Sequence, residues 1–278
     1  MADLGIPAVS PNRALWEKGD FTQIAATMRE SGERLVDTLG IVSGMKVLDL
    51  GCGDGTTAVP AAQRGADVLG VDIAANLVAA GNARAADAGL DNLRFRQGDA
   101  CDLSDLADNS FDLVVSLFGA MFAPRPFDVA REIVRVTRPG GRIVMGNWIP
   151  GDPTLVAQIL RISSAYTPAP PAGFVSPMTW GDEAQVCERF EAAGIAAADI
   201  GFERATWTFA LDGAPSQLLA IFRTYNGPTM NAFEAAARDG REGQLAAELE
   251  QLFADQNRGG EGRTEVAATF LKVTAIKR

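Results

Sequence analysis

The sequence predicts an α/β protein with a Rossmann-like, doubly wound sheet of seven strands, mostly parallel with an antiparallel last strand, plus a helical cap. From Lys46 onward, short apolar runs alternate with helical stretches, as right-handed crossovers in a parallel sheet require. Several of these runs end in Asp or Gly, at the sheet edge where such folds bind ligands. With 278 residues, 47% of them hydrophobic, the chain can bury a core without disulfides or metals.

The residues before this pattern, 1–44, are expected to form an N-terminal helical segment that covers a ligand site in the core. Its first twenty residues are rich in turn formers, with Pro7, Pro11 and Gly19. A helix is predicted over residues 21–39, because apolar side chains recur there at helical spacing and Gly40 follows as a stop.

The core, residues 45–150, is predicted to hold five strands joined by helices. The strands are the apolar runs at residues 47–50, 67–71, 93–96, 111–116 and 142–148. Helical stretches lie at residues 56–64, 75–88 and 127–137. Gly89 and the Pro139-Gly140-Gly141 turn are expected to end the second and third of them. Runs that are apolar throughout indicate strands buried on both faces.

Residues 151–278 are expected to complete the sheet and to build the cap. Strands are predicted at about 202–211 and 265–277, with a helix at 182–193 before them. Two insertions would form the cap: a proline-rich loop at about 151–181, with one helix near 155–165, and a mostly helical stretch at about 212–260. Breaks are expected in the second insertion at Gly227-Pro228 and at Gly240. A cap of this size favours an enclosed small-molecule site.

The first strand leads into a glycine-rich turn, Asp49-Leu50-Gly51-Cys52-Gly53-Asp54-Gly55. Glycines between a strand and a helix let a ligand approach the backbone closely, and the following helix N-terminus offers free N–H groups to an anion. Dinucleotide enzymes and methyltransferases share this device. The dinucleotide fingerprint, however, has a third glycine or alanine where this chain has Thr56.

Three carboxylates follow three successive strands. Asp49, Asp72 and Asp99 stand at or just beyond the carboxyl ends of the first, second and third predicted strands, which meet along one edge of a parallel sheet. S-Adenosylmethionine carries a sulfonium, an amino group, a ribose diol and an adenine amine, all of which carboxylates can meet. The pyrophosphate of NAD would be repelled by three carboxylates. The pattern therefore favours S-adenosylmethionine.

Residues 47–148 resemble the class I S-adenosylmethionine-dependent methyltransferases of the ubiquinone and menaquinone biosynthesis type (methyltransferase domain 11/25 type). The glycine turn, residues 109–116 (Asn-Ser-Phe-Asp-Leu-Val-Val-Ser) and residues 135–142 (Arg-Val-Thr-Arg-Pro-Gly-Gly-Arg) carry the resemblance, in the order of that family's motifs. The flanks are similar to a bacterial subgroup, through residues 16–21, Pro124, Asn147-Trp148, residues 180–183 and residues 227–229.

The resemblance implies S-adenosylmethionine as cofactor and, residue by residue, the groups that hold its methionine part. The glycine turn would wrap it with Gly51, Cys52, Gly53 and Gly55. Asp49 would hold the amino group, directly or through water. Ser116 and Leu117 would supply backbone groups nearby.

For the adenosine part, the resemblance implies Asp72 on the ribose hydroxyls and Ile73 packed on the adenine face. Asp99 would accept a hydrogen bond from the adenine amine, with the Ala100 backbone beside it. From the N-terminal segment, Trp16 and Phe21 would close over the cofactor.

Candidate acceptor contacts follow the fourth and fifth strands or lie in the cap. The first group can equally be ordinary core: Phe118, Met121, Phe122 and Trp148. The second group is Tyr166, Arg223 and Tyr225; for the last two, a structural ion pair is favoured over a contact with the acceptor.

No catalytic residue is assigned. The chain has no histidine, and tyrosine is a poor base at neutral pH. A methyl group on a positive sulfur is already activated, so an in-line displacement can rely mainly on proximity and orientation, worth about 7–11 kcal/mol. The expected acceptor is a small molecule that arrives ionised or is intrinsically nucleophilic at an O, N or C atom.

Composition and charge disfavour several kinds of binding partner and cellular setting. A net charge of −10 disfavours nucleic acid. The three scattered cysteines and the missing histidines predict no metal site and a reducing, cytoplasmic setting. No apolar run is long enough for membrane insertion. The expected state is monomer or homodimer. Two alternatives stay open: a nucleotide-binding oxidoreductase of Rossmann type, and a non-catalytic S-adenosylmethionine-binding protein.

Overall fold

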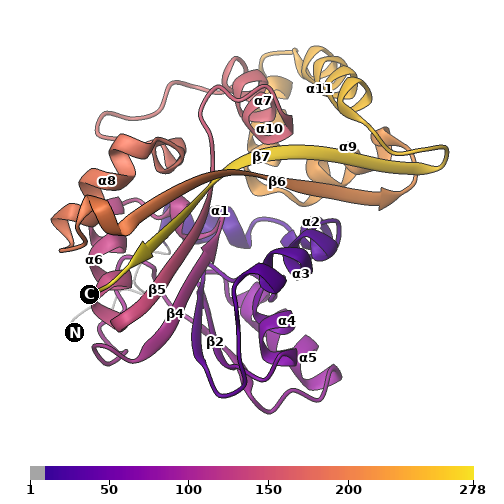
Figure 1. Cartoon of the computed structure of the whole chain (residues 1–278). Helices are drawn as coiled ribbons and strands as arrows, with labels where there is room; N and C mark the ends of the chain where they lie inside the picture. Colours follow the sequence, from indigo (N-terminus) through magenta and orange to yellow (C-terminus); the bar gives the residue numbers. More distant parts are fainter. Residues whose placement is uncertain (1–9) are drawn as a thin grey trace, which may run out of the picture.

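A computed structural model describes residues 10–278; residues 1–9, with the turn expected at Pro7, lie outside the described part. A seven-stranded sheet runs in the order β3-β2-β1-β4-β5-β7-β6 (Figure 1). Its strands are β1 (Lys46–Leu50), β2 (Asp67–Asp72), β3 (Leu93–Gln97), β4 (Phe111–Leu117), β5 (Thr137–Trp148), β6 (Ile200–Asp212) and β7 (Arg263–Ile276). The first five pair in parallel, and β7 is antiparallel to both β5 and β6. The predicted fold class is confirmed.

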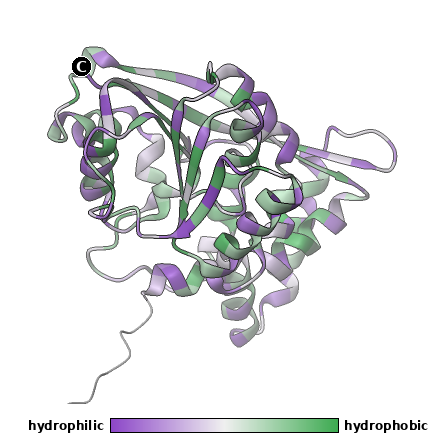
Figure 2. Cartoon of the chain, turned by 90° about the horizontal axis from the view of Figure 1, so that it is seen from below, coloured by the Kyte–Doolittle hydropathy of each residue, from purple (hydrophilic) through white to green (hydrophobic). Residues whose placement is uncertain are grey.

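Helices cover both faces of the sheet. On one side lie α3 (Arg29–Thr38), α4 (Ala58–Gln63) and α5 (Ala75–Asp87), and on the other α6 (Pro126–Val136) and α8 (Glu183–Ala192) (Figure 1). Successive residues of β4 alternate between two cores: Leu113 packs with the α3–α5 side and Val114 with the α6 side. Figure 2 shows the result as hydrophobic strands inside helices of mixed character. Burial on both faces explains why the central strands β1, β2 and β4 are mostly apolar, whereas the edge strand β3 alternates buried and exposed residues.

A helical cap lies above β6 and β7 in Figure 1. It consists of α7 (Leu155–Ser164), α9 (Pro215–Tyr225), α10 (Gly227–Arg238) and α11 (Glu242–Gln256), with α11 packed against both α7 and α9. The helices break at Gly227 and Gly240, as predicted from the sequence. Short 3₁₀ turns, η1 (Ala120–Phe122), η2 (Pro177–Gly181) and η3 (Ala197–Asp199), punctuate the connections.

The N-terminal segment differs from the expectation in two places. Residues 11–17, expected as turns, form a helix, α1 (Pro11–Glu17), which Ser10 caps by accepting from the Arg13 N–H. The single helix expected over residues 21–39 is two, α2 (Phe21–Ala26) and α3. The break follows from a distant contact, because the carbonyl of Thr27 accepts a hydrogen bond from the Ala210 N–H of β6 at 2.8 Å.

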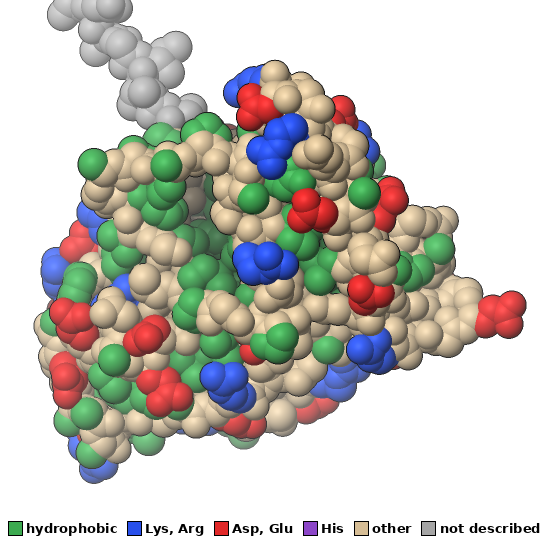
Figure 3. Space-filling view, turned by 90° about the horizontal axis from the view of Figure 1, so that it is seen from above, with side chains coloured by type: hydrophobic (Ala, Val, Ile, Leu, Met, Phe, Trp, Pro, Cys, Tyr) green, Lys and Arg blue, Asp and Glu red, His purple; other side chains and the backbone are tan. Residues whose placement is uncertain are grey.

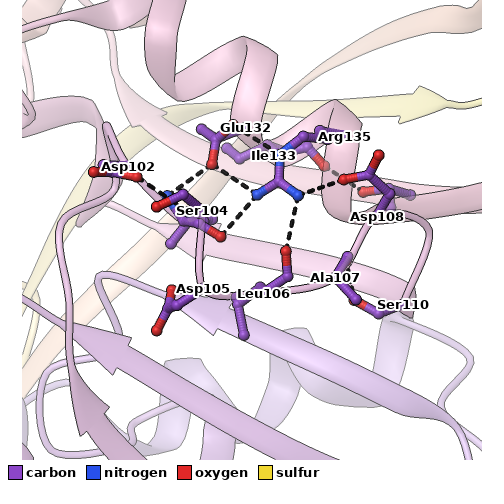
Figure 4. A network of polar contacts seen from close by, with 12 residues as sticks. Asp102, Ser104, Asp105, Leu106, Ala107, Asp108, Ser110, Glu132, Ile133 and Arg135 are labelled. Atoms are coloured by element: carbon purple, nitrogen blue, oxygen red, sulfur yellow. Dashed lines mark hydrogen bonds and ion pairs between the residues drawn. The ribbon is translucent and has the colours of Figure 1, made fainter.

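An arginine fixes the connection between β3 and β4 (Figure 4). The guanidinium of Arg135 on α6 donates to the carbonyls of Leu103 and Leu106 at 2.7 and 2.8 Å, and to both carboxylate oxygens of Glu132. Glu132 in turn accepts from the Leu103 N–H at 2.7 Å. The loop that begins just after Asp99 is therefore held against α6.

No helix of residues 10–278 combines the length and the apolarity needed to cross a bilayer. The longest, α11, has 15 residues, where a spanning helix needs about 20. Those same residues hold no group of three or more His, Cys, Asp or Glu side chains placed to share a metal ion.

Candidate functional site

The glycine turn begins at the carboxyl end of β1 and is anchored to β2. The Gly51 N–H donates to the Val71 carbonyl at 2.7 Å. Gly51 has a φ of +68°, and a Cβ there would lie 2.6 Å from the Cα of Gly119. Gly53 has a φ of +55°, but a Cβ there would meet nothing within 4 Å. Gly51 is thus a glycine because backbone packs on it, whereas Gly53 faces open space.

Asp72 joins the glycine turn to the start of α5. Its carboxylate accepts from the Gly53 N–H at 2.8 Å and from the Ala74 N–H at 2.9 Å. Burial raises the pKa of Asp72, while the hydrogen bonds from these N–H groups lower it. Asp99 lies beyond the end of β3 and accepts from the Cys101 N–H at 2.8 Å. Both carboxylates are held by backbone, so their remaining lone pairs face a fixed direction.

Asp49 is different because it is buried without a full set of partners. Asp49 is 2% exposed, and its Oδ2 has no hydrogen-bond partner. Burial, followed by the charge of Asp72, raises the pKa of Asp49 to about 8. A buried carboxylate in this state favours a cation or a donor beside it.

These groups surround a first cavity at the carboxyl edge of the sheet. Four carboxylates line it, and no Lys or Arg does: Asp49, Asp54, Asp72 and Asp99. Of the expected cofactor contacts, the cavity wall includes Trp16, Phe21, Asp49, Gly51, Cys52, Gly53, Asp72, Ile73, Asp99, Ala100 and Leu117. The acidic lining, in which Asp54 is paired with Arg29 and Arg84 from outside the wall, suits a cationic ligand and opposes a pyrophosphate.

Two expected cofactor residues stand behind this wall. A Cβ on Gly55 would lie 2.6 Å from the ring of Phe95, so this glycine makes room for packing. The Ser116 hydroxyl donates to the Leu50 carbonyl at 2.6 Å and accepts from the Ala120 N–H at 3.0 Å. Ser116 therefore ties the ends of β1 and β4 together.

The N-terminal segment closes the same side of the molecule. α1 packs against α5 and α10, and Glu17 accepts from the Ala75 N–H at the start of α5 at 3.0 Å. The edge of the Trp16 ring meets Phe21 at 5.6 Å and Phe122 at 4.9 Å between centroids.

A second cavity of about 530 Å³ adjoins the first. The two share wall residues from α1, α2 and the end of β4: Asn12, Trp16, Phe21, Met28 and Phe118. The rest of the second wall comes mainly from the cap and the proline-rich loop. No Asp, Glu, Lys, Arg or Tyr lines it. On the face shown in Figure 3, hydrophobic side chains gather around a hollow.

Phe118 stands between the two cavities in an unusual backbone conformation. Its φ is +63°, a region that costs a bulky residue on the order of 1–3 kcal/mol. Its ring stacks on Trp148 with centroids 3.7 Å apart and planes 5° from parallel, and the Trp207 ring meets it edge-on at 5.0 Å. Such strain persists only where its surroundings enforce it.

The expected acceptor contacts divide between cavity and core. Phe118, Phe122 and Trp148 line the second cavity. Met121 is 1% exposed within the hydrophobic core. The remaining three line neither cavity: Tyr166, Arg223 and Tyr225. Tyr166 donates to Glu248 at 2.5 Å, and Arg223 pairs with Glu242.

Sequence reasoning missed one wall of the second cavity. α7 contributes Val156, Ile159, Leu160 and Ser163, and from the sheet the first cavity gains Trp207, whose buried Nε1 has no partner. The four α7 positions have the spacing of one helix face, so the sequence shows that they lie together. It does not show which part of the molecule this face lines.

The chain is similar to known proteins along most of its length. A family model described as a methyltransferase domain matches residues 48–145. The uncharacterized protein Rv1403c of Mycobacterium tuberculosis is 35% identical over 227 residues, which cover 81% of this chain and 80% of that protein. A demethylmenaquinone methyltransferase of Renibacterium salmoninarum is 38% identical over 114 residues, 41% of this chain and 46% of that one.

Among solved structures, phosphoethanolamine N-methyltransferase 2 of Haemonchus contortus aligns with a TM-score of 0.60 and 17% sequence identity. The alignment covers 98% of this chain and 62% of that protein. At 17% sequence identity, the alignment shows that the two proteins share a fold and nothing more.

Proposed function

The chain belongs to the class I S-adenosylmethionine-dependent methyltransferases, of the type that includes the ubiquinone and menaquinone enzymes, and we propose that its acceptor is a small molecule bound in the second cavity. The observation that carries the proposal is the contrast between adjoining cavities. One is lined by four carboxylates, and the other has no charged side chain in its wall. A cationic donor and an uncharged acceptor would meet at the residues they share.

The residues of the first cavity fit the cofactor. Asp49, with its unpartnered Oδ2, would hold the amino group, and the open space beside Gly53 would admit the methionine chain. Asp72 would hold the ribose hydroxyls, with Ile73 against the adenine, and Asp99 would accept from the adenine amine. The remaining contacts in this proposal are Gly51, Cys52, Ala100, Leu117, Trp16 and Phe21.

The reaction needs little from side chains beyond position. When bound, S-adenosylmethionine supplies a methyl group on a positive sulfur; the acceptor lone pair forms the new bond, and the carbon–sulfur electron pair stays on sulfur. Phe118 and Trp16, which border both cavities, would fix the angle of approach. The N-terminal helices would exclude water. Such orientation can supply about 7–11 kcal/mol.

The wall shared by the two cavities contains no acid or base. Its five residues are Asn12, Trp16, Phe21, Met28 and Phe118, none of which titrates near neutral pH. We therefore infer that the acceptor, uncharged in this cavity, reacts through an intrinsically nucleophilic atom. A proton on that atom would pass to solvent after the transfer.

Two variants of β2 test the cofactor site. Asp72→Ala removes the carboxylate at the carboxyl end of the strand, and Asp67→Ala removes one at the other end, where the side chain is 52% exposed. Calorimetric titration should show S-adenosylmethionine binding weakened at least tenfold in the first and unchanged in the second. Equal affinity in wild type and Asp72→Ala would contradict the ribose assignment.

Two further measurements address the alternatives. A thermal shift with NADH and none with S-adenosylmethionine would favour an oxidoreductase. An acceptor panel that yields S-adenosylhomocysteine would establish turnover, whereas tight cofactor binding with no product from any acceptor would favour a non-catalytic binding protein.

A further inference from the structure

The wall of the second cavity contains one buried side-chain oxygen without a hydrogen-bond partner. Ser163 lies in its wall on α7. The residue is 8% exposed, and its Oγ is buried without a hydrogen-bond partner. Serine hydroxyls within helices ordinarily bond a carbonyl of the preceding turn. The neighbouring Ser164 does so, donating to the Arg161 carbonyl at 2.7 Å.

The side-chain oxygens of the other two polar residues that the cap places there, Asn226 and Thr229, are already engaged. Asn226 caps α10, its Oδ1 accepting from the Thr229 N–H at 3.1 Å and from the Thr229 hydroxyl at 2.9 Å. Their bonds hold the helix rather than a ligand. A buried hydroxyl without a partner costs free energy, so Ser163 is the group whose bond a ligand would complete.

The rest of the wall limits what that ligand can be. Its side chains are mostly aliphatic or aromatic, with Trp148, Phe122, Phe209 and Phe222 among them. A carboxylate, phosphate or ammonium would lose its hydration here and find no opposite charge. The volume of about 530 Å³ lies within the range that holds drug-sized ligands.

We propose that the second cavity binds an uncharged, largely apolar acceptor, and that Ser163 Oγ hydrogen-bonds one hydroxyl or carbonyl oxygen of that acceptor. This inference rests on the proposed function, since it treats the cavity as the acceptor site. Ser163 borders only the second cavity. The oxygen it holds is therefore distinct from the atom that faces the cofactor, and the contact orients the acceptor.

Three naphthalenes of similar size isolate each part of the proposal: 2-acetylnaphthalene, 2-ethylnaphthalene and 2-naphthoate. Binding is measured by the change in tryptophan fluorescence, in wild type, Ser163→Ala and Ser164→Ala. We expect the wild type to bind the ketone at least tenfold more tightly than the carboxylate. Ser163→Ala should weaken binding of the ketone about 3- to 10-fold, the value of one hydrogen bond, and leave binding of 2-ethylnaphthalene unchanged. Ser164→Ala should bind all three as the wild type does.

Several results would overturn the inference: equal binding of 2-naphthoate and the ketone, no binding of either uncharged ligand, or an equal effect of Ser163→Ala on the ketone and the hydrocarbon. A parallel titration with S-adenosylmethionine separates the two proposals. Ketone binding that depends on Ser163 in a protein that does not bind S-adenosylmethionine refutes the proposed function alone. Normal cofactor binding without the ketone effect refutes this inference alone.

Discussion

Three glycines with similar backbone angles distinguish a cofactor contact from a folding requirement. Gly51, Gly53 and Gly89 have φ values of +68°, +55° and +64°. Replacing any of them by Ala imposes the left-handed conformation on a residue with a Cβ, which costs roughly 1–2 kcal/mol. For Gly53 and Gly89 that is the whole expected loss, because a Cβ would meet nothing within 4 Å.

Gly51→Ala should cost more, because its Cβ would lie 2.6 Å from the Cα and 2.8 Å from the carbonyl carbon of Gly119. Overpacking of this kind adds about 1–3 kcal/mol, so urea denaturation should rank Gly51→Ala well below the other two variants. Gly53 lines the first cavity and Gly89 ends α5 outside it. Calorimetric titration should therefore show that S-adenosylmethionine binds at least tenfold more weakly to Gly53→Ala and with wild-type affinity to Gly89→Ala.

Wild-type affinity of Gly53→Ala for S-adenosylmethionine, with only the loss of stability expected from the backbone conformation, would refute the assignment of Gly53 to the cofactor site. Equal stability of Gly51→Ala and Gly89→Ala would mean that the close approach to Gly119 does not constrain position 51. S-Adenosylhomocysteine, titrated in parallel, shows whether the loss comes from shape or from the charge on sulfur.

Three further predictions concern charge. The pKa of Asp49, raised to about 8 by burial, means that the folded protein without ligand binds a proton that the unfolded chain releases near pH 4. Stability should thus fall as pH rises from about 4 to 8. Thermal melts of Asp49→Asn should show a flatter dependence on pH, and this variant should bind S-adenosylmethionine more weakly. Arg135 lowers the pKa of Glu132, so this pair stabilises above the ordinary pKa of Glu132 and the contribution is lost as pH falls through its lowered value. Arg135→Ala should cost about 1–3 kcal/mol and move acid denaturation to higher pH; an unchanged acid midpoint would refute this. The pH profile of kcat/KM should shift with the pKa of the acceptor when two acceptors are compared, whereas a fixed inflection would indicate an enzyme base.

The sheet was predictable because its signals are local. The central strands β1, β2 and β4 are mostly apolar runs, and the carboxylates at the strand ends follow from chain order in a parallel sheet. Asp49, Asp72 and Asp99 therefore came together in the first cavity as expected. The predicted family is likewise confirmed, since the motifs on which it rests lie within residues 48–145 and their immediate flanks.

The cap and the second cavity were less predictable because they depend on contacts between distant segments. The break between α2 and α3 occurs where Ala210, far along the chain, bonds the Thr27 carbonyl. The hydroxyl of Ser163 looks like that of Ser164 in the sequence, yet one is buried without a partner and the other bonds its own helix. Helical spacing identifies the buried face of α7 but not the element that faces it. The start of α1 was not predicted, although Ser10 before Pro11 is a strong local signal for a helix start.

The two cavities share a structural origin at the end of β4. Ser116 binds the Leu50 carbonyl and the Ala120 N–H, and Gly119 packs on Gly51 with no room for a side chain. The backbone between these two fixed points passes through Phe118, which accepts a φ of +63°. That conformation brings its ring onto Trp148 and into the wall of both cavities. The close packing that shapes the glycine turn of the proposed cofactor site therefore also sets the aromatic wall of the proposed acceptor site. A change at Gly119 should thus disturb both sites, although it lines only the first.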